Sequence, residues 1–245
     1  ANNVAIGRCA MHVNTTGASN VAIGTQALIT NTTGCRNTAI GMESMYSNTS
    51  GENNIAMGQS ALEANTIGDF NVALGVKALD ANTTADGNTA VGSCSLTANT
   101  SMGCNTAVGY QSAQANTTGG CNVAVGCGAL SSNTTGTRSV AIGMGALKEA
   151  TVGGTNTAVG YNALCAMTNN QDNTAIGRAS NTVTTTGYGI TTVGSNSNPA
   201  GATDTNEIVI GGTTGKGNST AFINAYNTAV FAGNNSANFS TTSDR

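Results

Sequence analysis

Acidic side chains in this sequence recur at a fixed 17-residue interval. Glu52, Asp69 and Asp86 form one such series, and Glu63 and Asp80 form another. If each interval is one turn of a repeating structure, the members of a series stack on neighbouring turns. Two neighbouring carboxylates can bind a cation or serve as the acid and base of a glycosidase. Solvated turn positions that keep a repetitive protein soluble are the simpler interpretation, and we favour it.

The other groups that catalysis needs are absent from the sequence or poorly placed in it. His12 is the only histidine, and the next two residues in its series, Ile29 and Tyr46, share no chemistry with it. A variable position of this kind is typical of an exposed surface. The glycines at 211–212 and 215–217 lack the spacing and the following helix of a phosphate-binding loop. We therefore predict that the protein is not an enzyme, with no catalytic, cofactor-binding or metal-binding residues.

Two of the seven cysteines stand one interval apart. Cys104 and Cys121 would lie on neighbouring turns, within reach of a disulfide bond. Free thiols in a reducing compartment are the favoured alternative, because the other five cysteines pair poorly. The disulfide is a hypothesis that intact mass before and after reduction can test.

Asparagines that begin Asn-x-Ser/Thr tripeptides, the acceptor pattern for N-linked glycans, also recur at this interval. They are Asn14, Asn31, Asn48, Asn82, Asn99, Asn116 and Asn133. In a secreted filament they would carry a line of glycans. We favour turn chemistry with stacked side-chain amides, because Asn and Thr suit turns unaided. Tyr110 and Tyr161 share another series and could touch sugar on a target surface, although isolated surface tyrosines are common.

All of these series follow from one repeated phrase. Asn-Val-Ala-Ile-Gly occupies residues 3–7 and 20–24, and its closing glycine returns at the same interval without insertion or deletion. The thirteen glycines are Gly7, Gly24, Gly41, Gly58, Gly75, Gly92, Gly109, Gly126, Gly143, Gly160, Gly177, Gly194 and Gly211. A fixed period in this range indicates a solenoid, in which each unit stacks on the next. We expect an all-β solenoid of 17-residue coils over residues 1–211.

The phrase itself has the pattern of a short strand. The residue before each glycine is aliphatic, a β-branched residue stands two positions earlier, and alanine lies between them on the opposite face. Representative members of the repeat are Asn20, Ala22, Ile23, Gly24, Asn37, Ala39, Ile40, Gly41, Asn71, Ala73, Leu74 and Gly75. Near-exclusive alanine suggests close approach of another backbone. We therefore expect the alanines to face partner chains and the Val/Thr and Ile positions to fill each chain's own roll.

Further positions of each coil also have a structural interpretation. The strand-end glycine is expected to adopt a positive φ. An Ala-Leu pair, such as Ala27-Leu28, supplies a second apolar contact, so we expect two strands per coil. Asn-Thr-Thr-Gly, as at 31–34, is turn chemistry in which glycine would be left-handed. The two asparagine series, represented by Asn20 and Asn31, are expected to form amide ladders from coil to coil.

Composition narrows the class of partner. Only 8% of residues are charged, the formal net charge is −3, and Lys and Arg are scattered, so we expect no nucleic-acid partner. No apolar run approaches membrane-spanning length, so we expect no membrane insertion. Residues 212–245 differ from the array and hold four of the nine aromatic residues, and we interpret them as a cap or transition segment.

The repeat resembles known fibre sequences. Asn156 to Tyr161 (Asn-Thr-Ala-Val-Gly-Tyr), followed by Ala163-Leu164, resembles repeats in bacteriophage tail fibres. The Asn-x-Ala-Ile-Gly core is also similar to the head repeat of YadA-like trimeric autotransporter adhesins, whose repeats are shorter. The adhesin resemblance implies a left-handed β-roll assembled as a homotrimer. Over residues 1–211, the resemblance implies a structural fibre protein.

The C-terminal end carries a second resemblance. Ser240 to Arg245 is similar to the junction at which tail fibres enter an S74-type intramolecular chaperone, which trimerises the fibre and cleaves itself off. Ser243 and Asp244 match the cleavage junction, whereas the catalytic partner would lie beyond Arg245. The junction favours a phage fibre over an autotransporter.

The expected function is therefore that of a homotrimeric tail-fibre shaft in the virion. It would mediate attachment to a host cell-surface receptor, either a glycan or an outer-membrane component. Three alternatives stay open: an autotransporter-type adhesin head on a bacterial surface, a glycosylated extracellular filament, and an ice-binding solenoid that exposes the series Thr15, Thr32 and Thr49.

Overall fold

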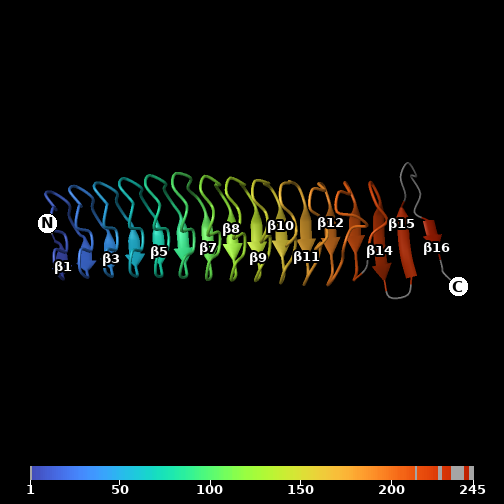
Figure 1. Cartoon of the computed structure of the whole chain (residues 1–245), viewed down its shortest axis with the longest axis horizontal. Coiled ribbons are helices and arrows are strands. Elements are labelled where there is room, and N and C mark those ends of the chain that lie inside the picture. The colour runs from blue at the N-terminus through green and yellow to red at the C-terminus, as the bar shows by residue number, and fades with distance from the viewer. Residues whose placement is uncertain (1, 213, 226–227, 233–239, 243–245) are drawn as a thin grey trace.

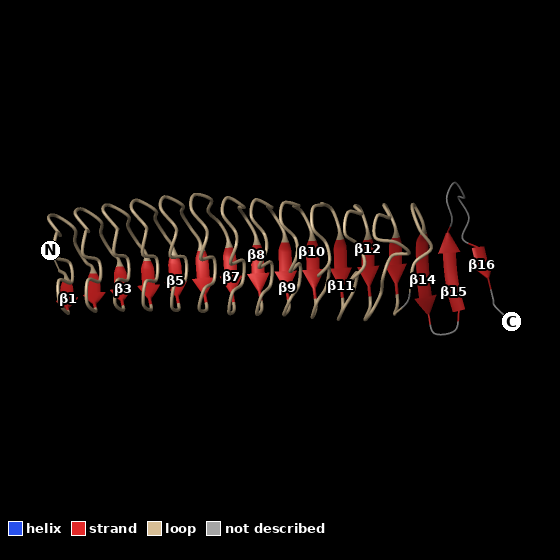
Figure 2. Ribbon diagram, in the orientation of Figure 1, coloured by secondary structure: helices blue, strands red, loops and turns tan. Residues whose placement is uncertain are grey.

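The computed structural model describes the backbone of residues 2–212, 214–225, 228–232 and 240–242. In this part of the chain, the structure is a parallel β-solenoid of thirteen coils, and no helix is present. The strands stand in one row along the rod, with β1 near one end and β16 near the other (Figures 1 and 2). The predicted all-β solenoid with 17-residue coils is confirmed. Left-handed winding and trimeric assembly stay predictions.

One sheet contains all sixteen strands in sequence order. The strands of the repeat array are β1 (Val4–Ile6), β2 (Val21–Ile23), β3 (Thr38–Ile40), β4 (Ile55–Met57), β5 (Val72–Leu74), β6 (Thr89–Val91), β7 (Thr106–Val108), β8 (Val123–Val125), β9 (Val140–Ile142), β10 (Thr157–Val159), β11 (Thr174–Ile176), β12 (Thr191–Val193) and β13 (Ile208–Ile210). The remaining strands are β14 (Ala221–Ala225), β15 (Thr228–Ala232) and β16 (Ser240–Thr242).

Each strand of the array pairs with the strand of the following coil. Ala22 lies opposite Ala39, and Ala56 lies opposite Ala73, so equivalent positions stack in straight columns. Each coil contains one short strand, such as Val21–Ile23, and the prediction of two strands per coil is wrong. The Ala-Leu segment lies in a turn because its backbone is not extended.

Left-handed residues close the coil. Gly24 follows β2 and has φ +137°, as expected, and a Cβ there would come within 2.5 Å of the Gly41 carbonyl oxygen on the next coil. Leu28 and Leu62 are also left-handed, with φ of 52° and 54°, although leucine is strained in this region. Their side chains are fully buried, and we infer that packing offsets the strain. Nothing in the amino-acid pattern indicated a left-handed leucine.

Glycine is required in the Asn-Thr-Thr-Gly turn for a different reason. Gly34 does not have a positive φ, so the predicted left-handed conformation is wrong. A Cβ at Gly34 would instead collide with the Asn31 side-chain oxygen and with the carbonyl oxygen of Gly51. Close stacking of the coils, rather than backbone conformation, therefore requires glycine here.

The interior of the roll is lined by small side chains. The alanines at the centre of the strands, including Ala22, Ala39 and Ala73, are fully buried inside a single chain, where they belong to the same core as Leu28 and Leu62. The prediction that the alanines face partner chains is therefore wrong. So short a coil encloses so little space that only a methyl group fits opposite leucine.

Two columns of buried asparagine hold the coils together. In one column, the side-chain amides of Asn20 and Asn37 donate to the carbonyl oxygens of Gly34 and Gly51, respectively. The Asn20 side-chain oxygen accepts a hydrogen bond from the Asn37 backbone N–H at 2.8 Å. In the other, the Asn48 amide donates to the Asn31 side-chain oxygen at 2.8 Å. These contacts confirm the expected amide ladders, and they explain how a thin apolar core suffices.

The regular spacing ends at β13. Strand β14 pairs in parallel with β13 but places Ala221 opposite Ile208, a shorter step along the chain than in the array, and β15 and β16 continue the sheet antiparallel. Fully buried Glu207 stands in an asparagine column at this point. Its carboxylate accepts the backbone N–H groups of Ala200, at 3.1 Å, and Gly217, at 2.8 Å. Glu207 thus fixes the segment that leads out of the last coil. Ser243 and Asp244 lie outside the described residues.

Candidate functional site

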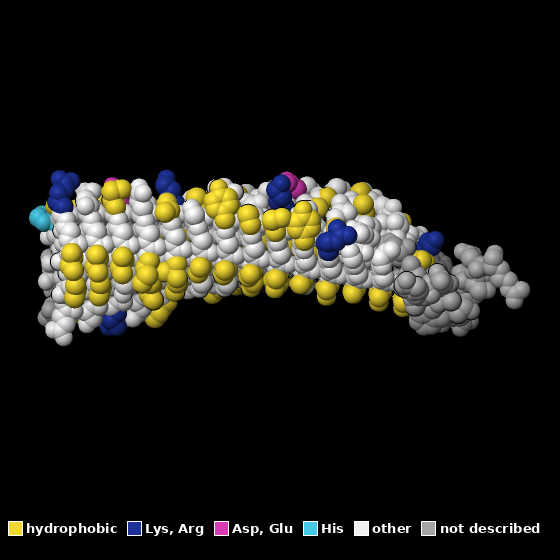
Figure 3. All heavy atoms as spheres, turned by 90° about the horizontal axis from the view of Figure 1, so that it is seen from below, with side chains coloured by type: hydrophobic (Ala, Val, Ile, Leu, Met, Phe, Trp, Pro, Cys, Tyr) yellow, Lys and Arg dark blue, Asp and Glu magenta, His cyan; other side chains and the backbone are white. Residues whose placement is uncertain are grey.

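The outward face of the strands carries a continuous band of aliphatic side chains. Because strand residues alternate, burial of the central alanine turns the residues on both sides of it outward. Ile23, Ile40 and Leu74 are half-buried, and Ile142 and Ile176 expose 40% and 43% of their surface. These residues were expected to fill the roll, and the structure places them on its surface instead. Figure 3 shows hydrophobic side chains following one another along the rod.

Two columns make up the band, which we call the aliphatic band. The residue that begins each strand contributes Val, Ile or Thr, and the residue that ends it contributes only Ile, Val, Leu or Met. None of these twenty-six side chains is charged, across all thirteen coils. Threonine begins six of the thirteen strands, including β3 and β6. That share of threonine was the signal in the sequence that this column is outward.

The column of Glu52, Asp69 and Asp86 stabilises the stacking of the coils. The Asp69 and Asp86 carboxylates accept the backbone N–H groups of Glu52 and Asp69 at 2.6 and 2.7 Å. Glu52 also pairs with Arg36 of the preceding coil. These contacts are structural. No cluster of three or more His, Cys, Asp or Glu side chains suited to a metal ion occurs in residues 2–212 or the other described ranges.

The second acidic column contains an ionisable group in an unfavourable position. One carboxylate oxygen of Asp80 is buried and has no hydrogen-bond partner among the described residues. Burial raises the pKa of Asp80 above its usual value of 3.8, and the charge of Glu63 raises that pKa further, while the Lys77 ammonium opposes both. A single carboxyl in this setting weakens the fold at neutral pH.

The remaining candidate residues are separated along the rod. His12 is exposed on the first coil. Cys104 and Cys121 are free, exposed thiols on neighbouring coils, and the disulfide between them stays a prediction. Tyr110 and Tyr161 expose 53% and 46% of their surface. Over the described part of the chain, no helix is both long enough and apolar enough to cross a bilayer.

The hydrogen bonds between coils weaken two alternatives for the function, the glycosylated filament and the ice-binding solenoid. The amides of Asn31 and Asn48 are fully buried and donate within the ladder, so a glycan could not be attached without opening the roll. The Thr15 and Thr32 hydroxyls donate to carbonyl oxygens of the next coil at 2.8 and 3.0 Å. A regular array of free hydroxyl donors, as ice binding would need, is therefore not presented by this column.

Comparison with known proteins identifies no relative of the chain. No protein-family model, no curated protein and no solved structure matches the chain.

Proposed function

We propose that the chain forms the shaft of a homotrimeric fibre, in which three parallel copies cover one another's aliphatic band. The fibre holds an attachment surface against a host cell. Bacteriophage tail fibres are the class of protein that the repeat and the C-terminal junction resemble.

The length and composition of the aliphatic band carry this proposal. Thirteen coils at about 4.8 Å each extend roughly 60 Å, and two strand positions lie about 7 Å apart, so the band covers on the order of 400 Å². The largest contiguous apolar patch on a soluble monomer is typically about 300–600 Å² and is often a functional surface, so the area of the band fits an interaction surface. A band without a single charged side chain also has the composition of an interface core.

The repeat supports parallel association. A symmetry axis along the rod places each coil of one copy beside the same coil of the next, so one set of contacts is repeated along the whole length. The number three comes from the resemblance to trimeric fibres. Two copies related by such an axis are the competing arrangement, and the mass of the assembly separates the two.

The experiment is a measurement of mass in solution, by light scattering or equilibrium sedimentation. A trimer has three times the chain mass of 24.1 kDa. Replacing outward Val108 and Val125 together by Glu should give a folded monomer, because neither side chain enters the roll. Thr135→Glu, at an exposed turn position, is the matched control and should stay trimeric. A wild-type monomer, or a trimer that survives both glutamates, would refute the proposal.

The class of fibre is tested separately, from the coding sequence beyond Arg245. A chaperone domain there supports a phage fibre. A coiled coil with a membrane anchor would instead assign the chain to the autotransporter adhesins.

A further inference from the structure

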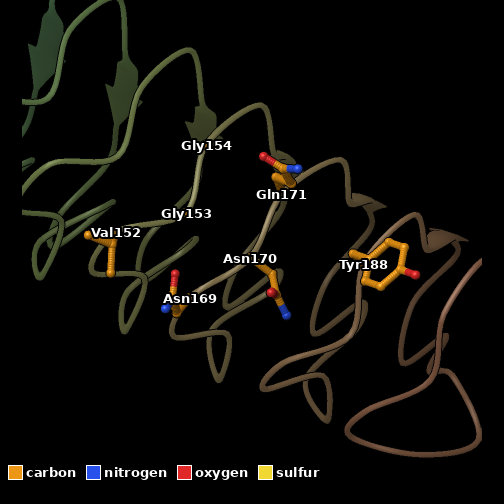
Figure 4. A pocket seen from close by; sticks show the side chains of 7 residues that line it. All are labelled: Val152, Gly153, Gly154, Asn169, Asn170, Gln171 and Tyr188. Carbon is orange, nitrogen blue, oxygen red and sulfur yellow. The ribbon is translucent and has the colours of Figure 1, made fainter.

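A hollow of about 310 Å³ opens at the turns of three consecutive coils. These turns follow β9, β10 and β11. Its lining consists of Val152, Gly153, Gly154, Asn169, Asn170, Gln171 and Tyr188. Val152 and Tyr188 stand at its two ends, with Asn169, Asn170 and Gln171 between them (Figure 4). The volume lies at the lower end of the range for small-molecule sites, roughly 300–1,000 Å³.

The repeat changes at this place. Ala150 and Met167 replace the asparagine that opens the turn in the first eight coils, so the ladder of side-chain amides ends at Asn133. Asn170 stands where the turn has glycine in most other coils. A shaft that had only to be stiff would gain nothing from these changes. Local departures from a structural rule are expected where a protein has a function to carry.

The frame of the hollow is held firmly. The Asn170 side-chain amide donates to the Gly187 carbonyl oxygen at 2.9 Å, and the Asn170 carbonyl oxygen accepts from the Asn156 amide at 2.7 Å. At Gly153, a Cβ would collide with the backbone of Asn170. The turns therefore have a preformed shape, which reduces the loss of conformational freedom when a ligand binds.

The side chains at the surface of the hollow suit a neutral, hydroxylated ligand. Tyr188 exposes 51% of its surface and offers an aromatic ring, on which the C–H groups of a sugar ring can stack. The exposed Asn169 and Gln171 amides make no hydrogen bond within the described part of the chain. An amide both donates and accepts, as a sugar hydroxyl does. None of the seven lining residues is charged, which disfavours phosphate or an acidic sugar.

We propose that this hollow binds one or two units of a neutral cell-surface glycan. The inference rests on the proposed attachment role of the fibre. Tyr188 supplies the stacking surface, and Asn169 and Gln171 bind the hydroxyl groups.

Saturation-transfer NMR on the assembled protein tests the proposal, with the methyl glycosides of glucose, galactose and N-acetylglucosamine as probes. At least one of the three should receive saturation at its ring protons. Tyr188→Ala should reduce the transfer about fivefold or more, which corresponds to the loss of one aromatic contact. Gln171→Ala should reduce it as well. Tyr110→Ala removes an equally exposed tyrosine outside the hollow and should change nothing.

Both substitutions in the hollow are compatible with the fold, because Ala18 occupies the equivalent position of the first coil. Absence of transfer to all three probes, or equal transfer to wild type and Tyr188→Ala, would overturn the glycan site. The mass of each sample is measured in parallel. A trimer that binds no sugar refutes the site and leaves the fibre intact, whereas a monomer that binds sugar through Tyr188 refutes the assembly alone.

Discussion

The side-chain amide of Asn65 donates a 2.8 Å hydrogen bond to the side-chain oxygen of Asn48, which lies one coil earlier. The Asn65 oxygen in turn accepts from Asn82 at 2.9 Å. Each asparagine of this column is therefore both donor and acceptor, and all three residues are fully buried. In a stack with a thin apolar core, these bonds carry a large share of the cohesion between coils.

Removal of one member of the ladder should weaken the neighbouring coils. Asn65→Ala leaves the Asn48 oxygen without its donor in a buried site, and we expect a loss of roughly 2–4 kcal/mol in the free energy of unfolding. Urea unfolding and hydrogen exchange in β4 to β6 measure the effect. Gln59→Ala, at an exposed position nearby, should change stability by less than about 0.5 kcal/mol. Equal stability of the two variants would contradict the structural role of the ladder.

Two glycines on the same rod should respond differently to alanine. Gly75 has φ +139°, and a Cβ there would lie 2.6 Å from the Gly92 carbonyl carbon. Gly75→Ala should therefore destabilise the fold by roughly 3 kcal/mol or more. Gly128 has φ +62° with open space around it, so Gly128→Ala should cost only about 1–2 kcal/mol. Thermal unfolding of both variants makes the comparison, and a reversed order would show that the coils stack less closely than described.

Asp80 should make stability depend on pH. Because burial raises its pKa in the folded state above 3.8, the folded protein holds the Asp80 proton more tightly than the unfolded chain does. The contribution of the protonated Asp80 carboxyl to the stability of the fold is complete below pH 3.8, and it is lost as the pH rises through the raised pKa of the folded state. Asp80→Asn cannot ionise, so it should be more stable than wild type at pH 7, and the difference should shrink toward pH 3.

Urea unfolding of wild type and Asp80→Asn across this pH range measures that difference. Asp172→Asn changes an exposed carboxyl and serves as the control. A gap between wild type and Asp80→Asn that stayed constant from pH 3 to pH 7 would rule out titration of Asp80 as its cause.

Glu207 should matter only at the end of the array. Glu207→Ala removes the acceptor of the Ala200 and Gly217 backbone N–H groups, a loss of roughly 3 kcal/mol in local stability. Hydrogen exchange should accelerate in β13 and β14 and stay unchanged in β1 to β10, because coils of a solenoid interact mainly with their neighbours. Glu149→Ala, an exposed carboxylate, should leave exchange unaltered. Unchanged protection of β14 in Glu207→Ala would show that other contacts hold this segment.

Much of the candidate site could be located from sequence, but its orientation was not predicted, although the threonines that begin six of the thirteen strands carried a signal for it. The periodicity identified the columns of Ile23 and Ala22 as opposite faces of one strand, which the structure confirms. Both columns are small or aliphatic, so hydrophobicity did not indicate which faced inward. The hollow beside Tyr188 was not predicted either, because its lining residues come from three turns whose sequences differ from one another.

By itself, the sequence determined the repeat: an unbroken 17-residue period forces equivalent residues into columns, and Asn, Gly and Ala in those columns dictate ladders, tight stacking and a narrow interior. Only the tertiary structure decided which way each coil bends. Left-handed residues such as Leu28 turn the chain toward the alanine face, and a loop this short, closed on that side, leaves room for only a methyl group opposite the buried leucine. The Ile and Val columns therefore lie outside, where another molecule can reach them.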